Sequence, residues 1–410
     1  MLLNQSFYRV KIAMKKRLVL LLALLVLTSC SHGSNDDSQQ AIQSALSAEW
    51  QSYTLAHPNW GGGMALLIST PRGNYFAAEG FPAGAPVSEA LHFRGASTTK
   101  TFTAAAIMLL HQRGHLHIDH VLTDPIPGTA QPYLPNAADY AIPNKHQITI
   151  RQLLQHRGGV FDITNQSIPP EAPAPYAGKM YLDYVREELG DDAHTFTFDE
   201  IARVVSVNNL YHSFPGQGFH YSNTGFALLG KIIERVSGKG FDEFVRDELL
   251  LPLALDATSF PRLGTDQTIP PPFAAGFTWS SGLLYPTTLD NMSGSVAEGN
   301  VITSLTDLSR WNRLLLMGKA GIDAALAAEM MSCLPTYEEH QFYGLGIEFT
   351  PGLGYGHNGG HMGYMTVTRY DPETQVTVTL FAAVINADDM YGQLDWMYDL
   401  ARNAKRLLGY

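Results

Sequence analysis

The chain has 410 residues, a formal net charge of −11 and only two cysteines, Cys30 and Cys333. This length suffices for a large core and for two domains, and the acidic balance argues against nucleic acid or an anionic lipid surface as a partner. Residues 1–29 carry five basic and no acidic residues, so their removal would bring the net charge to −16.

The first thirty residues are typical of an export signal. A basic stretch at 15–17 precedes an apolar run from 18 to 27, and small residues lead up to Cys30. The apolar run is shorter than the roughly 20 residues that span a bilayer. Its ending resembles the bacterial lipobox, whose cysteine is lipidated. We therefore predict a signal peptide over 1–29 and a protein anchored by lipid at Cys30 in the bacterial cell envelope, on the periplasmic side of the outer membrane if Gram-negative. The alternative is a plain secretory signal with a chance cysteine.

Strands and helices are predicted at both ends of the chain, after a small, polar tether over 30–40. Apolar spacing and turn residues indicate the following elements: a helix over 41–55, strands over 64–69 and 74–78, strands over 365–370 and 375–385, and a helix over 394–408.

The middle of the chain is predicted to be mainly helical. Residues 101–110 are apolar on nearly every side, which indicates a buried helix, and further helices are expected over 226–236 and 241–251. We therefore predict an α/β (α+β) fold within 41–408. An antiparallel sheet flanked by helices comes from 41–100 and 265–408, and a helical part comes from 101–264.

Ser97 and Lys100 lie at the start of the predicted buried helix. Residues three apart share a helix face, so the lysine amine can reach the serine hydroxyl. The helix N-terminus favours negative charge on Ser97, and burial lowers the pKa of a lysine toward that of a usable base. Taken alone, the pair is also compatible with Ser97 as a helix N-cap.

Two further segments could supply polar groups to the same cleft. In 221–223, Tyr221 can relay a proton and Asn223 can bind a substrate amide, although the same residues also suit a helix entry. In 356–360, glycines on a strand edge allow a substrate backbone to approach closely, and His357 can act as a donor. An ordinary glycine-rich hairpin is the alternative there.

Together, Ser-x-x-Lys, Tyr-x-Asn and His-x-Gly, in this order, resemble the serine penicillin-recognising enzymes, in particular the branch of class C β-lactamases and D-Ala-D-Ala carboxypeptidases. The resemblance covers about 41–408 and extends to 149–156 and 276–311. It implies the β-lactamase/DD-peptidase fold, with the active site between its two parts.

The resemblance also implies roles for individual residues. Ser97 would be acylated, with Lys100 and Tyr221 moving its proton. The N–H groups of Ser97 and Gly360 would form the oxyanion hole, and water would hydrolyse the acyl-enzyme. The substrate would contact four side chains or backbone positions, which are Asn223, His357, Asn358 and Gly359.

Two departures from the family pattern bear on the substrate. His357 stands where class C β-lactamases have lysine, and Asn358 stands where threonine helps to bind a substrate carboxylate. We therefore expect a D-alanyl-D-alanine carboxypeptidase-like peptidase or related amide hydrolase, with an esterase or weak β-lactamase as alternatives. The expected partner is a small-molecule or peptide substrate, such as a peptidoglycan stem peptide, a β-lactam or an ester. We expect a monomer without a cofactor.

Two rival interpretations remain open at this stage. Histidines and one aspartate cluster in 111–120, but the spacing lacks the glutamate of a zinc helix, so no metal is expected. A non-catalytic binding or sensor lipoprotein of the same fold is the second rival. The presence of Ser97, Lys100 and Tyr221 together favours the enzyme.

Overall fold

The computed structural model describes residues 37–337 and 341–410. The predicted signal peptide and Cys30 lie outside these residues. Residues 37–40, which the sequence assigns to the tether, belong instead to a helix that runs from 37 to 56. The reason is that Gln39 and Gln43 donate to the backbone of the adjacent edge strand, at Phe76 and Ala78, and so fix this polar turn.

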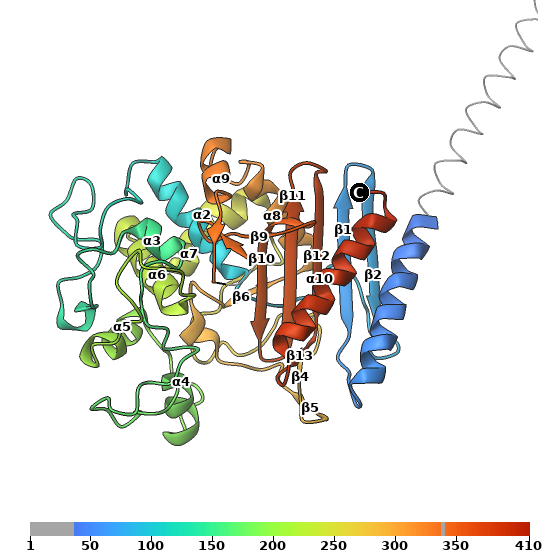
Figure 1. Cartoon of the computed structure of the whole chain (residues 1–410), viewed down its shortest axis with the longest axis horizontal. Coiled ribbons are helices and arrows are strands. Elements are labelled where there is room, and N and C mark those ends of the chain that lie inside the picture. The colour runs from blue at the N-terminus through green and yellow to red at the C-terminus, as the bar shows by residue number, and fades with distance from the viewer. Residues whose placement is uncertain (1–36, 338–340) are drawn as a thin grey trace, which may run out of the picture.

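An eight-stranded antiparallel sheet forms the centre of the α/β part (Figure 1). Its strands, in order across the sheet, are β2 (Gly73–Glu79), β1 (Met64–Thr70), β12 (Val376–Ala382), β11 (Tyr364–Asp371), β10 (Gly354–His361), β9 (Glu348–Thr350), β8 (Phe342–Tyr343) and β7 (Leu334–Pro335). The predicted pairs β1–β2 and β11–β12 are confirmed. Because β1 also pairs with β12, strands from both ends of the chain lie side by side.

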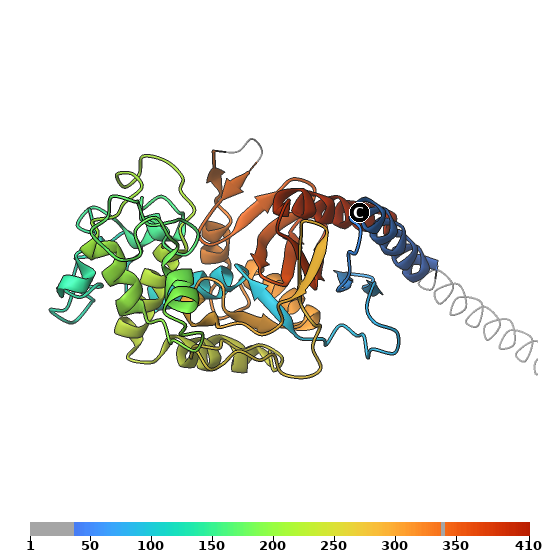
Figure 2. The same cartoon turned by 90° about the horizontal axis from the view of Figure 1, so that it is seen from below.

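Helices cover both faces of this sheet. The side chains of β1 alternate: Leu67 belongs to the core that contains α8 (Leu305–Leu316), while Leu66 belongs to the core beneath the 37–56 helix and α10 (Met390–Leu407). These last two helices lie next to each other in Figures 1 and 2, joined by Tyr53 stacked on Trp396. No helix within the described residues is both long and apolar enough to span a membrane.

The predicted strand over 375–385 divides at Ala383 into two strands of different sheets. Its second part, β13 (Val384–Asn386), joins a three-stranded sheet with two other short strands, β4 (Phe277–Ser280) and β5 (Leu283–Pro286). A third, two-stranded sheet pairs β3 (Phe93–Ala96) with β6 (Val301–Thr303). β3 leads directly into the predicted nucleophile.

The helical part packs against the other end of the sheet (Figure 1). Its helices are α2 (Thr99–Gln112), α3 (Ile150–Leu154), α4 (Tyr181–Asp183), α5 (Phe198–Val207), α6 (Asn223–Ser237) and α7 (Phe241–Val245), with α9 (Ala324–Met330) nearby. α2 is buried from Thr99 to Leu110, as predicted. The helix predicted over 241–251 is α-helical only to Val245 and then continues as a π-helix and a 3₁₀ turn, because Pro252 cannot donate to an α-helical ladder.

Candidate active site

The turn between β3 and α2 presents Ser97 at the mouth of a buried helix. Ala96 adopts a left-handed conformation with φ of 48°, which turns the chain sharply into the helix. Gly95 is required because a β-carbon there would lie 2.6 Å from Thr98 Oγ1. Within the described residues, the Ser97 N–H donates to no backbone carbonyl. It is therefore available to an oxyanion at the helix N-terminus.

Lys100 lies one turn further on, with Nζ 3.1 Å from Ser97 Oγ. Its side chain is completely buried and pairs with Glu298, whose Oε2 is 3.3 Å away and whose carbonyl oxygen is 2.7 Å away. Burial lowers the pKa of Lys100, and the Glu298 carboxylate opposes this effect. The lowered pKa brings the neutral amine, which can accept the Ser97 proton, closer to the working pH.

Tyr221 approaches the nucleophile from the other side. Its hydroxyl is hydrogen-bonded to Ser97, and burial raises its pKa well above 10. The side chain is therefore a phenol at neutral pH rather than a phenolate, and it suits proton donation better than proton abstraction. His156 packs on the Tyr221 ring, with centroids 4.1 Å apart, and accepts the Ser222 N–H through Nδ1 at 3.0 Å.

Asn223 begins α6, while Ser222 caps the helix by accepting from Gly225. The Asn223 amide nitrogen donates to Thr164 Oγ1 at 2.9 Å. Its buried Oδ1 has no hydrogen-bond partner among the described residues. Since a buried acceptor without a partner costs stability, this oxygen is the feature expected of a group that receives a substrate N–H. The amide nitrogen carries a second N–H besides the one that Thr164 accepts, so the side chain can offer a substrate amide both an acceptor and a donor.

β10 passes directly over the nucleophile turn. A β-carbon on Gly359 would lie 2.3 Å from the Gly95 carbonyl oxygen and 3.0 Å from the Ser97 nitrogen, so only glycine fits. The Asn358 N–H points away from β11, toward Glu348. Because alternate N–H groups of a strand point to the same edge, the Gly360 N–H lies on this edge too. It is placed to complete the oxyanion hole predicted with Ser97.

His357 is buried beneath the strand and does not carry a charge at neutral pH. Its Nδ1 lies 2.5 Å from the Asn358 carbonyl oxygen and must donate there, so its Nε2 accepts from the Tyr343 hydroxyl at 2.9 Å. Burial lowers the pKa of His357 to about 4. The histidine therefore does not replace the positive charge of a lysine at this position.

His361, at the end of β10, contacts a buried carboxylate. Its Nε2 lies 2.5 Å from Asp290 Oδ2, and Arg186 lies 2.7 Å from Oδ1 of the same carboxylate. Although burial opposes it, these partners lower the pKa of Asp290 to about 2. Arg94 on β3 donates to three backbone carbonyls on either side of the β4–β5 hairpin, those of Gln267, Thr288 and Asp290. These contacts hold both segments against the strand that precedes Ser97.

Glu298, Tyr343 and Glu348 contact the predicted residues but were not singled out from the sequence. Glu298 falls inside the stretch 276–311 that carries the family resemblance, which is the only signal that could have drawn attention to it. Tyr343 and Glu348 precede the His-x-Gly segment by too many residues for any local spacing to connect them. Their importance follows from the pairing of β8, β9 and β10.

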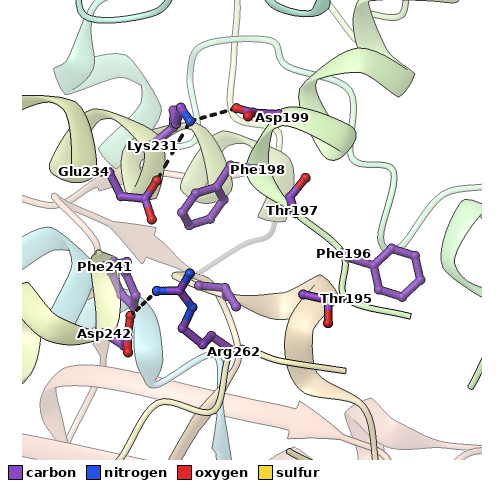
Figure 3. Close-up of a pocket in the computed structure, with 11 residues that line it drawn as sticks. Thr195, Phe196, Thr197, Phe198, Asp199, Lys231, Glu234, Phe241, Asp242 and Arg262 are labelled. Carbon is purple, nitrogen blue, oxygen red and sulfur yellow. Dashed lines mark hydrogen bonds and ion pairs between the residues drawn. The ribbon is translucent and has the colours of Figure 1, made fainter. Parts of the chain in front are cut away.

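A separate pocket lies between α5, α6 and α7 (Figure 3). Lys231 reaches Asp199 at 2.8 Å and Arg262 reaches Asp242 at 3.0 Å, so both of its cations have a carboxylate partner. None of the predicted site residues lines it. This pocket is therefore not the place where acyl transfer would occur.

The histidine-rich segment 111–120 carries ordinary contacts. Asp119 forms an ion pair with Arg151 at 2.5 Å, and His111 contacts the Leu116 carbonyl oxygen at 3.2 Å. Over 37–337 and 341–410, no three His, Cys, Asp or Glu side chains gather closely enough to hold a metal ion.

The site therefore brings together a serine just before α2, a buried lysine one turn further on and a neutral tyrosine just before α6, an arrangement that suits acyl transfer to the serine. The sequence pattern of the beta-lactamase family matches residues 55–401. The chain belongs to this family of serine hydrolases.

The chain is also similar, at 26–27% identity, to individual penicillin-binding and related proteins. A penicillin-binding protein of Bacillus subtilis strain 168 is 26% identical over 294 residues, which are 67% of this chain and 57% of that protein. Penicillin-binding protein 4 of Amycolatopsis lactamdurans is 27% identical over 314 residues, 70% of this chain and 71% of that protein. The chain covers only 39% of protein flp of Staphylococcus aureus strain MW2, with 26% identity.

Solved structures share the fold. The D-amino acid amidase of Ochrobactrum anthropi SV3, in complex with L-phenylalanine amide, gives a TM-score of 0.70 at 23% identity and covers 90% of this chain and 99% of its own. A D-stereospecific amidohydrolase from Streptomyces gives a TM-score of 0.67 at 24% identity and covers 85% of this chain and 93% of its own. The mixed α/β architecture predicted from the sequence is thereby confirmed.

Proposed function

We propose that this chain hydrolyses amide bonds of D-configured peptides or amides in the cell envelope, through an acyl-enzyme on Ser97. The class includes D-alanyl-D-alanine carboxypeptidase-like peptidases and related amidases. The proposal rests above all on one observation: a completely buried lysine amine lies 3.1 Å from the Ser97 hydroxyl. The names of the two solved relatives suggest D-amino-acid amides as the first substrates to test.

The reaction follows from the protonation states of the three groups. Lys100, in the neutral form that its lowered pKa makes more accessible, accepts the Ser97 proton while Oγ attacks the substrate carbonyl carbon. The N–H groups of Ser97 and Gly360 stabilise the oxyanion, each by a factor of about 10² to 10³. Tyr221 donates its proton to the leaving nitrogen and regains one from Lys100 as the amide bond breaks. Water then hydrolyses the ester and returns a proton to Ser97.

Covalent labelling tests the nucleophile. A fluorophosphonate should add one adduct per chain, measured by intact mass, and Ser97→Ala should abolish it while Ser69→Ala, on β1, should not. An adduct that survives Ser97→Ala would place the nucleophile elsewhere. No adduct on the wild type, under conditions that label known relatives, would favour the binding or sensor lipoprotein.

A substrate panel then separates the remaining alternatives. It contains a D-Ala-D-Ala peptide, a D-amino-acid amide, nitrocefin and a short-chain p-nitrophenyl ester. Fastest turnover of the peptide or amide supports the proposal. Hydrolysis of nitrocefin or of the ester far above the others would make the chain a β-lactamase or an esterase.

Export and lipid anchoring at Cys30 belong to the same proposal, supported by the basic stretch, the apolar run and the position of that cysteine. Labelled palmitate should enter the wild type expressed in bacteria and not Cys30→Ala. Incorporation into both would contradict anchoring at this residue. A monomer is expected by light scattering of the chain without its anchor.

A further inference from the structure

Glu348 occupies the edge of β10 beside the nucleophile. β9 pairs with β10 only at 354–356, so the edge of β10 from His357 onward has no neighbouring strand. The Glu348 side chain extends along this edge, where Oε2 accepts the Asn358 N–H at 3.2 Å. The side chain is 20% exposed, so the carboxylate fills the first part of the open edge and remains accessible from solvent.

Three donors converge on this one carboxylate. Besides its backbone N–H, Asn358 donates its side-chain amide, oriented with nitrogen toward Glu348, at 2.8 Å from Oε1. Arg369, fully buried on β11, donates to Oε2 at 2.6 Å. A guanidinium, a main-chain N–H and an amide form a receptor for a carboxylate. Here the protein's own side chain already occupies that receptor.

The receptor lies on the leaving-group side of the reacting carbonyl. Tyr221, which protonates the leaving atom, packs near Tyr343 and His357, with centroids 6.2 and 6.3 Å away. The leaving atom must therefore lie toward this end of β10. Two residues along a strand span about 7 Å. If the reacting carbonyl of the substrate is held at Gly360, the end of its leaving group one residue further on therefore lies next to Asn358 and Glu348.

Among the described residues, the cations closest to this place already have partners: Lys100 pairs with Glu298, and Arg369 pairs with Glu348. His357 cannot donate to a substrate from either ring nitrogen, because one donates to the Asn358 carbonyl and the other accepts from Tyr343. Arg369 is covered by Glu348 and also donates to Thr350, Thr368 and Tyr398. A substrate carboxylate would meet the Glu348 carboxylate instead of a positive charge.

We infer that Glu348 acts as a built-in carboxylate that excludes leaving groups ending in a free carboxylate, so that the enzyme takes amides or esters whose leaving group is uncharged. This inference rests on the proposed function and narrows it: D-amino-acid amides and amide-terminated peptides are preferred to D-Ala-D-Ala with a free C-terminus. Like charges placed together disfavour the wrong partner.

The test compares two substrates that differ only at the end in question, acetyl-D-alanyl-D-alanine and its C-terminal amide, on the full chain. The wild type should prefer the amide by about tenfold or more in kcat/KM. Glu348→Gln keeps an acceptor for Asn358 but removes the negative charge and leaves the charge of Arg369 unneutralised, so the preference for the amide should fall by about tenfold or reverse. Glu373→Gln, an exposed glutamate in the turn after β11, is the matched control and should leave it unchanged.

The outcomes separate this inference from the proposed function. A wild type that is labelled at Ser97 yet prefers the free acid overturns the role of Glu348, as does an unchanged ratio in Glu348→Gln. Absence of both labelling and turnover overturns the proposed function instead. If Glu348→Gln does not fold, a competition experiment on the wild type tests the inference, in which added ligand slows fluorophosphonate labelling of Ser97. D-alanine amide should protect Ser97 at a lower concentration than D-alanine, and the reverse order refutes the inference.

Discussion

Lys100 and Glu298 form an ion pair that is closed to solvent on both sides, with their side chains 0% and 4% exposed. The two residues are 198 positions apart in sequence, yet the glutamate touches the lysine that touches the nucleophile. A buried pair of this kind sets how readily the lysine gives up its proton. This makes Glu298 a positioning residue for Lys100, and its effect can be read from the pH dependence of acylation.

Glu298→Gln should move the acid limb of the acylation rate to lower pH. The carboxylate raises the pKa of Lys100 against the lowering by burial, so its loss lets that pKa fall further. Opposite charges at this range shift a pKa by about one unit or more. Fluorophosphonate labelling rates from pH 5 to 10 measure the shift. Glu234→Gln, beside Lys231 in the separate pocket, is the control; a limb that stays in place or moves to higher pH in Glu298→Gln would contradict this role.

Gly359→Ala should inactivate the enzyme, whereas Gly360→Ala should be tolerated. The first β-carbon would lie 2.3 Å from the Gly95 carbonyl oxygen, whereas the second would approach only side-chain atoms, the nearest being Met390 Sδ at 3.2 Å. Displacing β10 from the nucleophile turn should lower acylation by about a hundredfold and stability by about 1–3 kcal/mol. Thermal unfolding and labelling rates check both effects. Equal activity of the two variants would show that β10 does not need this close approach.

Asn223→Ala should slow substrates that carry an acylated amine and spare esters that lack one. Its unpartnered Oδ1 is the proposed acceptor for a substrate N–H, and loss of one such bond should lower kcat/KM by about tenfold. The neighbouring Ser222→Ala removes the α6 cap instead, which should cost about 1 kcal/mol of stability without changing this selectivity. Parallel loss of amide and ester turnover in Asn223→Ala would indicate a purely structural role.

The free energy of unfolding should fall as the pH is lowered from about 6.5 to 4. Burial lowers the pKa of His357 to about 4, so the folded state resists a proton that the unfolded chain accepts. The contribution of neutral His357 to stability is therefore complete above the pKa of histidine in the unfolded chain. It is lost as the pH falls toward and through the pKa of His357 in the folded state. His357→Gln should remove about 3 kcal/mol of this dependence in urea unfolding at pH 7 and 4. His146→Gln, at an exposed position, should leave the dependence as it is.

The sequence predicted those parts of the site that depend on local geometry. The three-residue step from Ser97 to Lys100 is read directly from helix periodicity, and α2 is buried where its composition predicts. The hairpins β1–β2 and β11–β12 follow from turn residues between apolar runs. The convergence of Tyr221 and His357 on the same cleft came from the family resemblance rather than from any spacing.

What could not be predicted depends on contacts between distant elements. Glu298 reaches Lys100 through the turn before β6, and Glu348 reaches Asn358 through the pairing of β9 with β10. The charge state of His357 also could not be predicted from the sequence, because its neutral form results from burial and from the hydrogen bond with Tyr343. The break of the last long strand at Ala383 reflects the two sheets that its halves join.

The pairing of β1 with β12 has a consequence for how the chain is made. During synthesis, the β1–β2 hairpin emerges from the ribosome long before β12, and until then the edge of β1 that pairs with β12 has no partner. Such an edge invites aggregation until β12 pairs with it. Because Gly359 on β10 lies against the Ser97 turn, the candidate site is assembled only after the final strands have been added to the sheet.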